Sequence, residues 1–349
     1  MALLPKRKWK LILNSVTKSQ IPYLNAVQTL RGFAACLVLL HHIWMFYPKI
    51  PFLYLAMQKM YLGVEVFFVI SGFIIPYSMF AAGYELKNIG LFLWKRILRI
   101  DPPYLVMIAI TLIINFSLNR SNVISFNNLL LHVAYLIPFT HEKWISSVFW
   151  TLAIEFQYYL IIAFIFPLLI HKNRWVILFT ISAILSLNLI SHSMDFLPRW
   201  VTYFVMGIVT FYFKINKINR NEYIIAILAL GILLKFQIST MFALVGIMSA
   251  FYLAFASFLN RITDFFGKIS YSLYISHWSF LPLISYFLVK SIGINPNFHV
   301  ILFLLSFMIC IIIAYIFYLF IEKYFAEKSK KISYHKKAKM LTDPNYASY

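Results

Sequence analysis

The chain has 349 residues, of which 62% are hydrophobic and only 12% are charged, and its mean hydropathy is +0.80. Soluble domains carry about twice that share of charge, so the composition excludes an ordinary soluble protein and indicates a polytopic membrane protein. The formal net charge of +20 is typical of basic residues held in cytoplasmic loops, and it does not predict a nucleic-acid partner.

Ten apolar stretches are long enough to be membrane-spanning helices, since about 20 mostly apolar residues cross the hydrocarbon layer. The short stretch at 222–235 is the weakest of them. The apolar segment 125–139 is shorter than a span and is interpreted as an interfacial or re-entrant piece. The ten predicted spans are 29–48, 60–80, 102–118, 149–170, 174–191, 196–213, 222–235, 238–258, 270–290 and 299–322.

The distribution of basic residues predicts the orientation of these spans. If the chain starts inside the cell, the outer loops carry only seven of the 31 Lys and Arg residues, which agrees with the positive-inside rule. We therefore predict an all-α bundle of about ten spans with both termini in the cytoplasm. Residues 1–28 are expected to form a cytoplasmic juxtamembrane arm, 29–322 the transmembrane domain and 323–349 a basic cytoplasmic tail.

Ionisable residues inside spans are the candidate functional groups, because each costs at least about 2.5–3.5 kcal/mol at the centre of the bilayer. In the first span Arg31 and His42 are eleven residues apart. At 100° per residue they share one helix face, about 16 Å apart along the axis, whereas His41 points about 80° away. His42 is therefore preferred over His41. The alternative is that Arg31 reaches the interface and His42 only bridges helices.

Three later spans also carry polar groups at depth. Glu65 lies near the start of the second span, where an unpaired carboxylate must become neutral or meet a cation, and Glu155 lies in the fourth. The other candidates have structural alternatives: close helix packing for Ser71, and hydrogen bonds between helices for the stripe in the ninth span formed by Ser270, Tyr274 and His277.

A basic segment joins the second and third predicted spans. Arg96 and Arg99 are at positions i and i+3 of a short predicted helix that ends at Asp101, Pro102 and Pro103. One interpretation is a topological anchor, and the other is an anion clamp, since paired arginines match phosphate oxygens. The two cysteines, Cys36 and Cys310, lie inside apolar runs and predict neither a disulfide framework nor a metal site.

Five motifs in chain order resemble those of the membrane acyltransferase-3 family, which includes bacterial O-antigen and exopolysaccharide O-acetyltransferases. The resemblance extends from about Leu24 to Glu322. Its motifs are Arg31 with His42, the Gly-Val-acidic-x-Phe-Phe segment with its later Ser-Gly-Phe at 63–73, the basic-Arg-x-x-Arg-Ile-x-Pro segment at 95–102, Trp-Thr-Leu-x-x-Glu at 150–155, and Ser-Tyr-x-x-Tyr-x-x-His at 270–277.

This resemblance implies an enzyme of the bacterial inner membrane that passes an acyl group, usually acetyl, from cytoplasmic acetyl-CoA to a hydroxyl of a cell-surface or lipid-linked saccharide, without a metal. Lys95, Arg96 and Arg99 would hold the coenzyme's phosphates. His42 would be the general base or a transient acyl carrier, supported by Arg31 and by Glu155 as an orienting carboxylate. Glu65, Ser71, Ser270, Tyr274 and His277 are further candidates for a channel or substrate site.

The sequence departs from the family pattern at two places. Lys95 stands where many members have arginine, and Lys323 follows Glu322 where many have a proline soon after. Some members continue into an extracytoplasmic esterase-like domain, so this chain is expected to complete the transfer itself or to use a partner acyl-acceptor protein. The competing function is a transporter of a small polar or anionic solute, for which buried charges are equally natural.

Overall fold

The structure is a computed structural model that describes residues 22–47, 60–118, 124–293 and 298–334. Throughout these ranges it is helical and contains no strand, which confirms the all-α prediction. Residues 1–21 of the predicted arm and 335–349 of the predicted tail lie outside the described residues.

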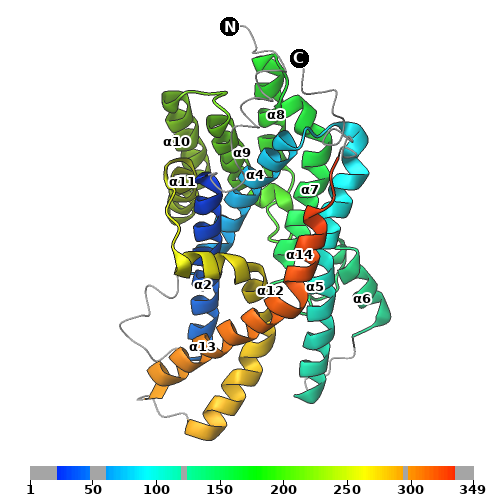
Figure 1. The fold of residues 1–349 in the computed structure, drawn as a ribbon, viewed down its shortest axis with the longest axis vertical. Helices are drawn as coiled ribbons and strands as arrows, with labels where there is room; N and C mark the ends of the chain where they lie inside the picture. Colours follow the sequence, from blue (N-terminus) through cyan, green and yellow to red (C-terminus); the bar gives the residue numbers. More distant parts are fainter. Residues whose placement is uncertain (1–21, 48–59, 119–123, 294–297, 335–349) are drawn as a thin grey trace, which may run out of the picture.

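The helices form one elongated bundle (Figure 1). In chain order they are α2 (Pro22–Phe46), α4 (Gly63–Ala81), α5 (Ile89–Ser117), α6 (Phe126–Val133), α7 (Trp150–Leu169), α8 (Arg174–Ser186), α9 (Leu197–Lys214), α10 (Arg220–Gln237), α11 (Thr240–Phe255), α12 (Arg261–Ile292), α13 (His299–Phe317) and α14 (Lys323–Lys330). The short helical turn η2 (Met60–Leu62) precedes α4, and η7 (Tyr318–Glu322) joins α13 to α14.

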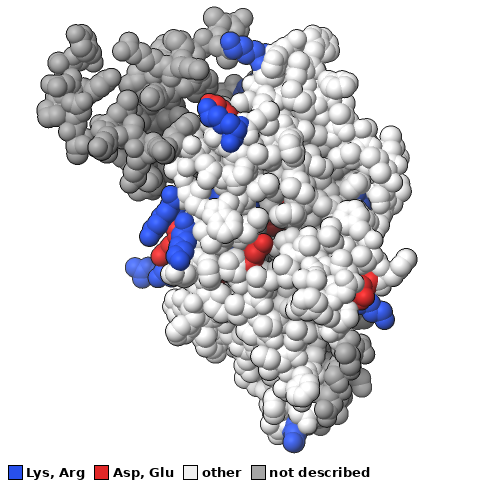
Figure 2. Space-filling model, turned by 90° about the vertical axis from the view of Figure 1, so that its right-hand side faces the viewer, with Lys and Arg blue, Asp and Glu red and all other residues white. Residues whose placement is uncertain are grey.

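Six helical segments of the described chain are long and apolar enough to cross a membrane: 25–46, 60–81, 86–117, 150–169, 261–292 and 299–330. Large apolar side chains on them are exposed, including Phe116 at 76% and Phe320 at 79%. Most of the face in Figure 2 likewise carries no charged side chain. These features are those of an integral membrane protein.

The other four predicted spans coincide with α8, α9, α10 and α11, which have 13, 18, 18 and 16 residues. At 1.5 Å per residue, 18 residues extend only about 27 Å. Helix α9 is buried on nearly every side, so its apolar surface is covered by other helices of the bundle. The segment predicted to be interfacial forms α6, whose eight residues are too few to cross.

Helix α5 differs from the prediction that a short helix ends at Asp101. It runs without a break through Pro102 and Pro103 to Ser117. In an α-helix Pro102 and Pro103 leave the carbonyls of Leu98 and Arg99 without their usual backbone donors. The hydroxyl of Tyr271 on α12 donates to the adjacent carbonyl of Ile100 at 2.8 Å and ties this part of α5 to the neighbouring helix. Arg96 and Arg99 therefore belong to the same rigid rod as the membrane-spanning part of α5.

The carboxyl-terminal helices also extend beyond the predicted limits. α14 continues the helix eight residues past Glu322, into the predicted tail. The intervening turn η7 is a π-helix, a local widening that often marks a functional site. Its last residue, Glu322, is 5% exposed and accepts hydrogen bonds from the backbone N–H and the hydroxyl of Ser272.

Two glycine contacts set how the central helices cross. A Cβ on Gly32 of α2 would lie 2.8 Å from the backbone nitrogen of Gly267 on α12, and a Cβ on Gly267 would collide with the carbonyl oxygen of Gln28. Gly72 of α4 and Gly207 of α9 meet the opposite backbone in the same way. Only residues without a side chain allow such close approach.

Candidate active site

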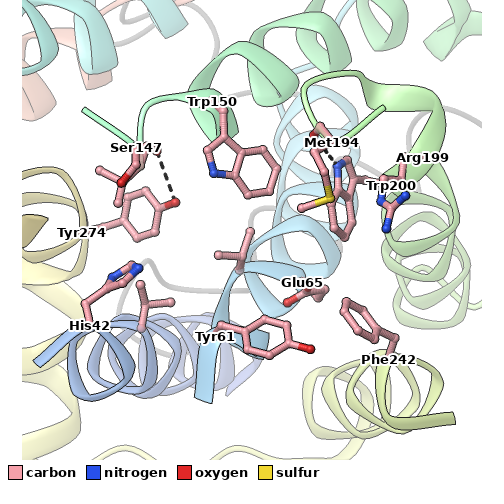
Figure 3. A pocket seen from close by; sticks show the side chains of 13 residues that line it. His42, Tyr61, Glu65, Ser147, Trp150, Met194, Arg199, Trp200, Phe242 and Tyr274 are labelled. Atoms are coloured by element: carbon pink, nitrogen blue, oxygen red, sulfur yellow. Dashed lines mark hydrogen bonds between the residues drawn. The ribbon is translucent and has the colours of Figure 1, made fainter. Parts of the chain in front are cut away.

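A cavity of about 140 Å³ lies where α2, α4, α7, α9, α11 and α12 converge (Figure 3). It contains three of the candidate residues, His42, Glu65 and Tyr274, on three different helices. Met194 and Tyr61 on its rim are 48% and 36% exposed, so the cavity opens there. The remaining lining residues are Val38, Val64, Ser147, Val148, Trp150, Arg199, Trp200 and Phe242.

The histidine of α2 is hydrogen-bonded to the histidine of α12. Nδ1 of His42 lies 2.7 Å from Nε2 of His277, and Nδ1 of His277 lies 3.0 Å from the carbonyl oxygen of Leu273. Because a carbonyl only accepts, Nδ1 of a neutral His277 carries the hydrogen and its Nε2 is the acceptor. His42 then donates from Nδ1, and its Nε2 keeps a free lone pair. This arrangement suits a general base or a nucleophile.

The Gly32–Gly267 contact explains why these histidines meet. His42 is ten residues after Gly32, and His277 is ten residues after Gly267. Helices α2 and α12 run side by side in the same direction in Figure 1. Equal steps of about 15 Å along two parallel helices therefore bring the two rings to the same level.

The Trp-Thr-Leu-x-x-Glu segment of α7 contributes to two separate sites. Trp150 lines the cavity, and the hydroxyl of Thr151 lies 2.9 Å from that of Tyr274. Glu155 is one turn further along and faces elsewhere. Its Oε1 accepts hydrogen bonds from Ser71 at 2.8 Å and Tyr159 at 2.6 Å. The expected pairing of Glu155 with His42 is not present. Glu155 lies one helical turn after Thr151, and its carboxylate binds Ser71 and Tyr159 and does not line the cavity.

The second site is a basic cluster, defined here as Arg31, Lys95, Arg96 and Arg99. Arg31 is close enough to Arg99, Glu155 and Glu322 for their charges to interact, and Arg96 is close to Arg99 and Glu155. Lys95 in turn interacts with Arg96 and Arg99. Four cationic side chains thus surround two carboxylates, which leaves an excess of positive charge inside the bundle.

Arg96 is the most enclosed member of the basic cluster, with 8% of its surface exposed. One guanidinium nitrogen donates to the hydroxyl of Ser78 at 2.9 Å, and the group packs over the rings of Phe92 and Tyr159. Its Nε is buried without a hydrogen-bond partner. A buried cation with an unused donor is suited to bind an anionic ligand.

The basic cluster and the cavity lie at different levels of the bundle. Ser78, which binds Arg96, follows Glu65 by thirteen residues on α4, a separation of about 20 Å. Arg31 and His42 are separated by about 16 Å along α2. The helix face that was predicted to carry both Arg31 and His42 therefore contributes one residue to each of two separate sites.

The remaining candidates have mixed outcomes. Ser270 is fully buried and donates to the carbonyl of Gly267 on its own helix at 2.8 Å, so it belongs to neither site. Lys95 donates to the carbonyl of Ile332 at 3.3 Å and lies over the ring of Tyr334. Among the described residues, no group of three His, Cys, Asp or Glu side chains is arranged to hold a metal.

Sequence reasoning did not select Arg199, Trp200, Tyr61 or Glu322. Arg199 had a signal, because it follows Pro198 within the first residues of the predicted span 196–213. Glu322 had one too, as the acidic residue that ends a long apolar run. The aromatic residues had none, since this chain contains 8 Trp and 23 Tyr.

Comparison with known proteins places these sites in a family context. A family described as an acyltransferase domain matches residues 24–319. The chain is 26% identical over 369 residues to the O-acetyltransferase OatA of Staphylococcus aureus strain NCTC 8325, and the strain COL protein gives the same figures. Each alignment covers 88% of this chain but only 58% of the relative's length. No solved structure matches the chain at a significant level.

Proposed function

Because this chain belongs to the acyltransferase-3 family, we propose that it is an integral membrane O-acetyltransferase. Its donor is acetyl-CoA from the cytoplasm, and its acceptor is a hydroxyl of a cell-surface or lipid-linked saccharide. The observation that carries the proposal is the hydrogen-bonded pair of His42 and His277, which leaves Nε2 of His42 unprotonated in a cavity.

The donor half of the proposal is supported by the basic cluster. Coenzyme A carries several phosphate charges, and Arg96 and Arg99 on one face of α5 match such oxygens in pairs. Arg31 and Lys95 add charge nearby. The thin pantetheine arm has the shape to cross the roughly 16–20 Å between the basic cluster and the cavity. The thioester then reaches the level of His42.

The acetyl transfer can be written with every atom accounted for. Nε2 of His42 takes the proton of the acceptor hydroxyl while the oxygen of that hydroxyl attacks the carbonyl carbon of the thioester. The new C–O bond forms, the C–S bond breaks, and the coenzyme A thiolate takes the proton from His42. His277 holds the imidazole in the required tautomer, the role that a carboxylate has in a catalytic triad. The same lone pair also suits a route through an acetyl-histidine intermediate.

The orientation of the protein in the membrane follows from the compartment that supplies the proposed donor. If the basic cluster faces the cytoplasm, where acetyl-CoA is made, both chain ends are cytoplasmic and the cavity faces outward. A reporter that is active only in the cytoplasm should then work when it is fused after Tyr349. The transporter alternative receives no support from the relatives, whose names describe acetyl transfer.

The direct test is release of coenzyme A thiol by the purified chain in detergent. We expect slow release with acetyl-CoA alone and faster release when a saccharide acceptor is added. One equivalent of thiol released in a burst without acceptor would favour the acetyl-histidine route. No thiol release with any acceptor would contradict the proposed function.

A further inference from the structure

Two ionisable side chains face the same cavity without forming a salt bridge. Glu65 is 2% exposed, and its Oε2 is buried without a hydrogen-bond partner. Arg199 lies close enough for the two charges to interact, yet the pair is not within salt-bridge distance, since the described chain forms such contacts only at Lys87–Glu85 and Lys268–Asp264. Arg199 uses one nitrogen on the carbonyl of His192, and its Nε is buried and unpartnered.

Unsatisfied buried polar atoms on two residues that line one cavity indicate a ligand, because each such atom is costly to leave without a partner. The ligand must donate hydrogen bonds to the Glu65 carboxylate and accept them from the Arg199 guanidinium. A hydroxyl group does both. A neutral ligand with several hydroxyls satisfies both residues without bringing a further charge into a buried site.

Aromatic rings line the cavity beside Glu65 and Arg199. The rings of Trp150 and Trp200 lie 5.6 Å apart, and those of Tyr61 and Phe242 lie 5.9 Å apart. Arg199 packs over the ring of Trp200. Ring faces carry partial negative charge, so they attract the C–H groups on the flat face of a sugar ring. Aromatic surface with a few polar groups is the usual composition of a specific small-molecule site.

We infer that Glu65, Arg199 and the Trp150–Trp200 wall form the acceptor subsite and that it binds a single neutral sugar residue. This inference deepens the proposed function and rests on it. The sugar's hydroxyls bind Glu65 and Arg199, and the hydroxyl to be acetylated points to Nε2 of His42 on the opposite side of the cavity (Figure 3). A volume of about 140 Å³ matches one sugar ring, and the opening beside Met194 and Tyr61 lets the rest of a saccharide lie outside.

The test measures the Michaelis constants for acceptor and donor separately in the parent, Glu65→Gln and Arg199→Met. The probes are methyl glucoside and methyl N-acetylglucosaminide as neutral acceptors and methyl glucuronide as an acidic one. Loss of a hydrogen bond to a charged group predicts an acceptor KM raised about tenfold or more. The KM for acetyl-CoA and the slow acceptor-independent thiol release should stay unchanged, and the neutral glycosides should outcompete the glucuronide.

Matched controls keep this test decisive. Arg174→Met removes an exposed arginine at the start of α8 and should leave every constant unchanged. Arg199→Lys keeps the charge, so it should fold like the parent and still raise the acceptor KM, because lysine lacks the planar fork. An unchanged acceptor KM in Glu65→Gln and both Arg199 variants, or preference for the glucuronide, would overturn the inference. A parent that releases no thiol with any saccharide would overturn the proposed function itself.

Discussion

Nδ1 of His42 and Nε2 of His277 are 2.7 Å apart although 235 residues separate them in the chain. The bond orients an imidazole whose second nitrogen faces the cavity, and the carbonyl of Leu273 fixes the tautomer. A histidine thus occupies the orienting position that the sequence assigned to Glu155.

His42→Ala should lower acetyl transfer by about 10²–10⁴-fold, the usual contribution of general acid–base catalysis. His41→Ala should retain most of the activity, since His41 does not line the cavity. The measurement is coenzyme A thiol release by purified variants at matched expression. Equal and small losses from both substitutions would mean that neither imidazole acts on the substrate.

His277→Leu should lower kcat by about 10–100-fold, less than the loss of His42, with little change in either KM. Leucine cannot accept the Nδ1–H of His42, so the ring loses its fixed tautomer. His277→Gln, whose amide oxygen can accept that hydrogen, should recover part of the rate. If the leucine and glutamine variants are equally impaired, His277 has a packing role and does not position the base.

Arg96→Lys combined with Arg99→Lys should weaken acetyl-CoA binding by about tenfold or more, because lysine keeps the charge but loses the bidentate geometry. Binding of acetyl-CoA to the purified protein in detergent measures this directly. The exposed Arg174→Lys is the matched control. Affinity equal to that of the parent would leave the arginines with a topological role only.

Gly267→Ala should destabilise the protein by about 1–3 kcal/mol, since its Cβ collides with the backbone of α2 and cannot be accommodated by a rotamer change. It should also lower kcat, because it shifts α2 against α12 and separates the two histidines. Gly90→Ala is the control: no atom lies within 4 Å of its Cβ, and alanine favours the helix. Thermal unfolding of both variants in detergent gives the comparison, and similar melting temperatures would contradict the contact.

Acidic pH should lower the stability of the folded loop that follows α6. His132 lies outside the membrane-spanning segments and is fully buried, and burial lowers its pKa below the ordinary value. Its Nε2 accepts the backbone N–H of Ile145 at 2.9 Å, which requires the neutral ring. The folded loop is therefore favoured above the unfolded-state pKa of about 6.5, and this stability is lost as pH falls below that value.

Hydrogen exchange at the Ile145 amide measures this effect. After correction for intrinsic rates, protection at pH 7 should exceed protection at pH 5. His132→Gln should abolish the difference, because its amide does not titrate. A protection factor that does not depend on pH in the parent would show that the His132 bond does not control this loop.

Helix positions and several candidate residues follow from the sequence alone, because membrane burial leaves a direct record in residue type. A run of apolar residues must be helical in lipid, and a charge such as Arg31 inside one is costly enough to imply a role. The same reasoning predicted ten spans, whereas six helical segments of the described chain are long and apolar enough to cross a membrane. Residue type does not distinguish a helix that is covered by other helices, such as α9, from one that faces lipid. The same reasoning also ended a helix at Asp101, because prolines usually interrupt a helix, whereas α5 continues through Pro102 and Pro103 to Ser117.

The amino-acid sequence was enough to predict the all-helical fold, the family resemblance and the preference for His42 over His41. The tertiary structure alone decided which residues act together: His277 with His42, Glu155 with Ser71 and Tyr159, and Glu65 opposite Arg199. The physical reason is that helical periodicity fixes the relative direction of side chains on one helix. Contacts between helices depend instead on where close approach is possible, here at Gly32 and Gly267. No local sequence pattern shows which residue of one helix lies beside which residue of another.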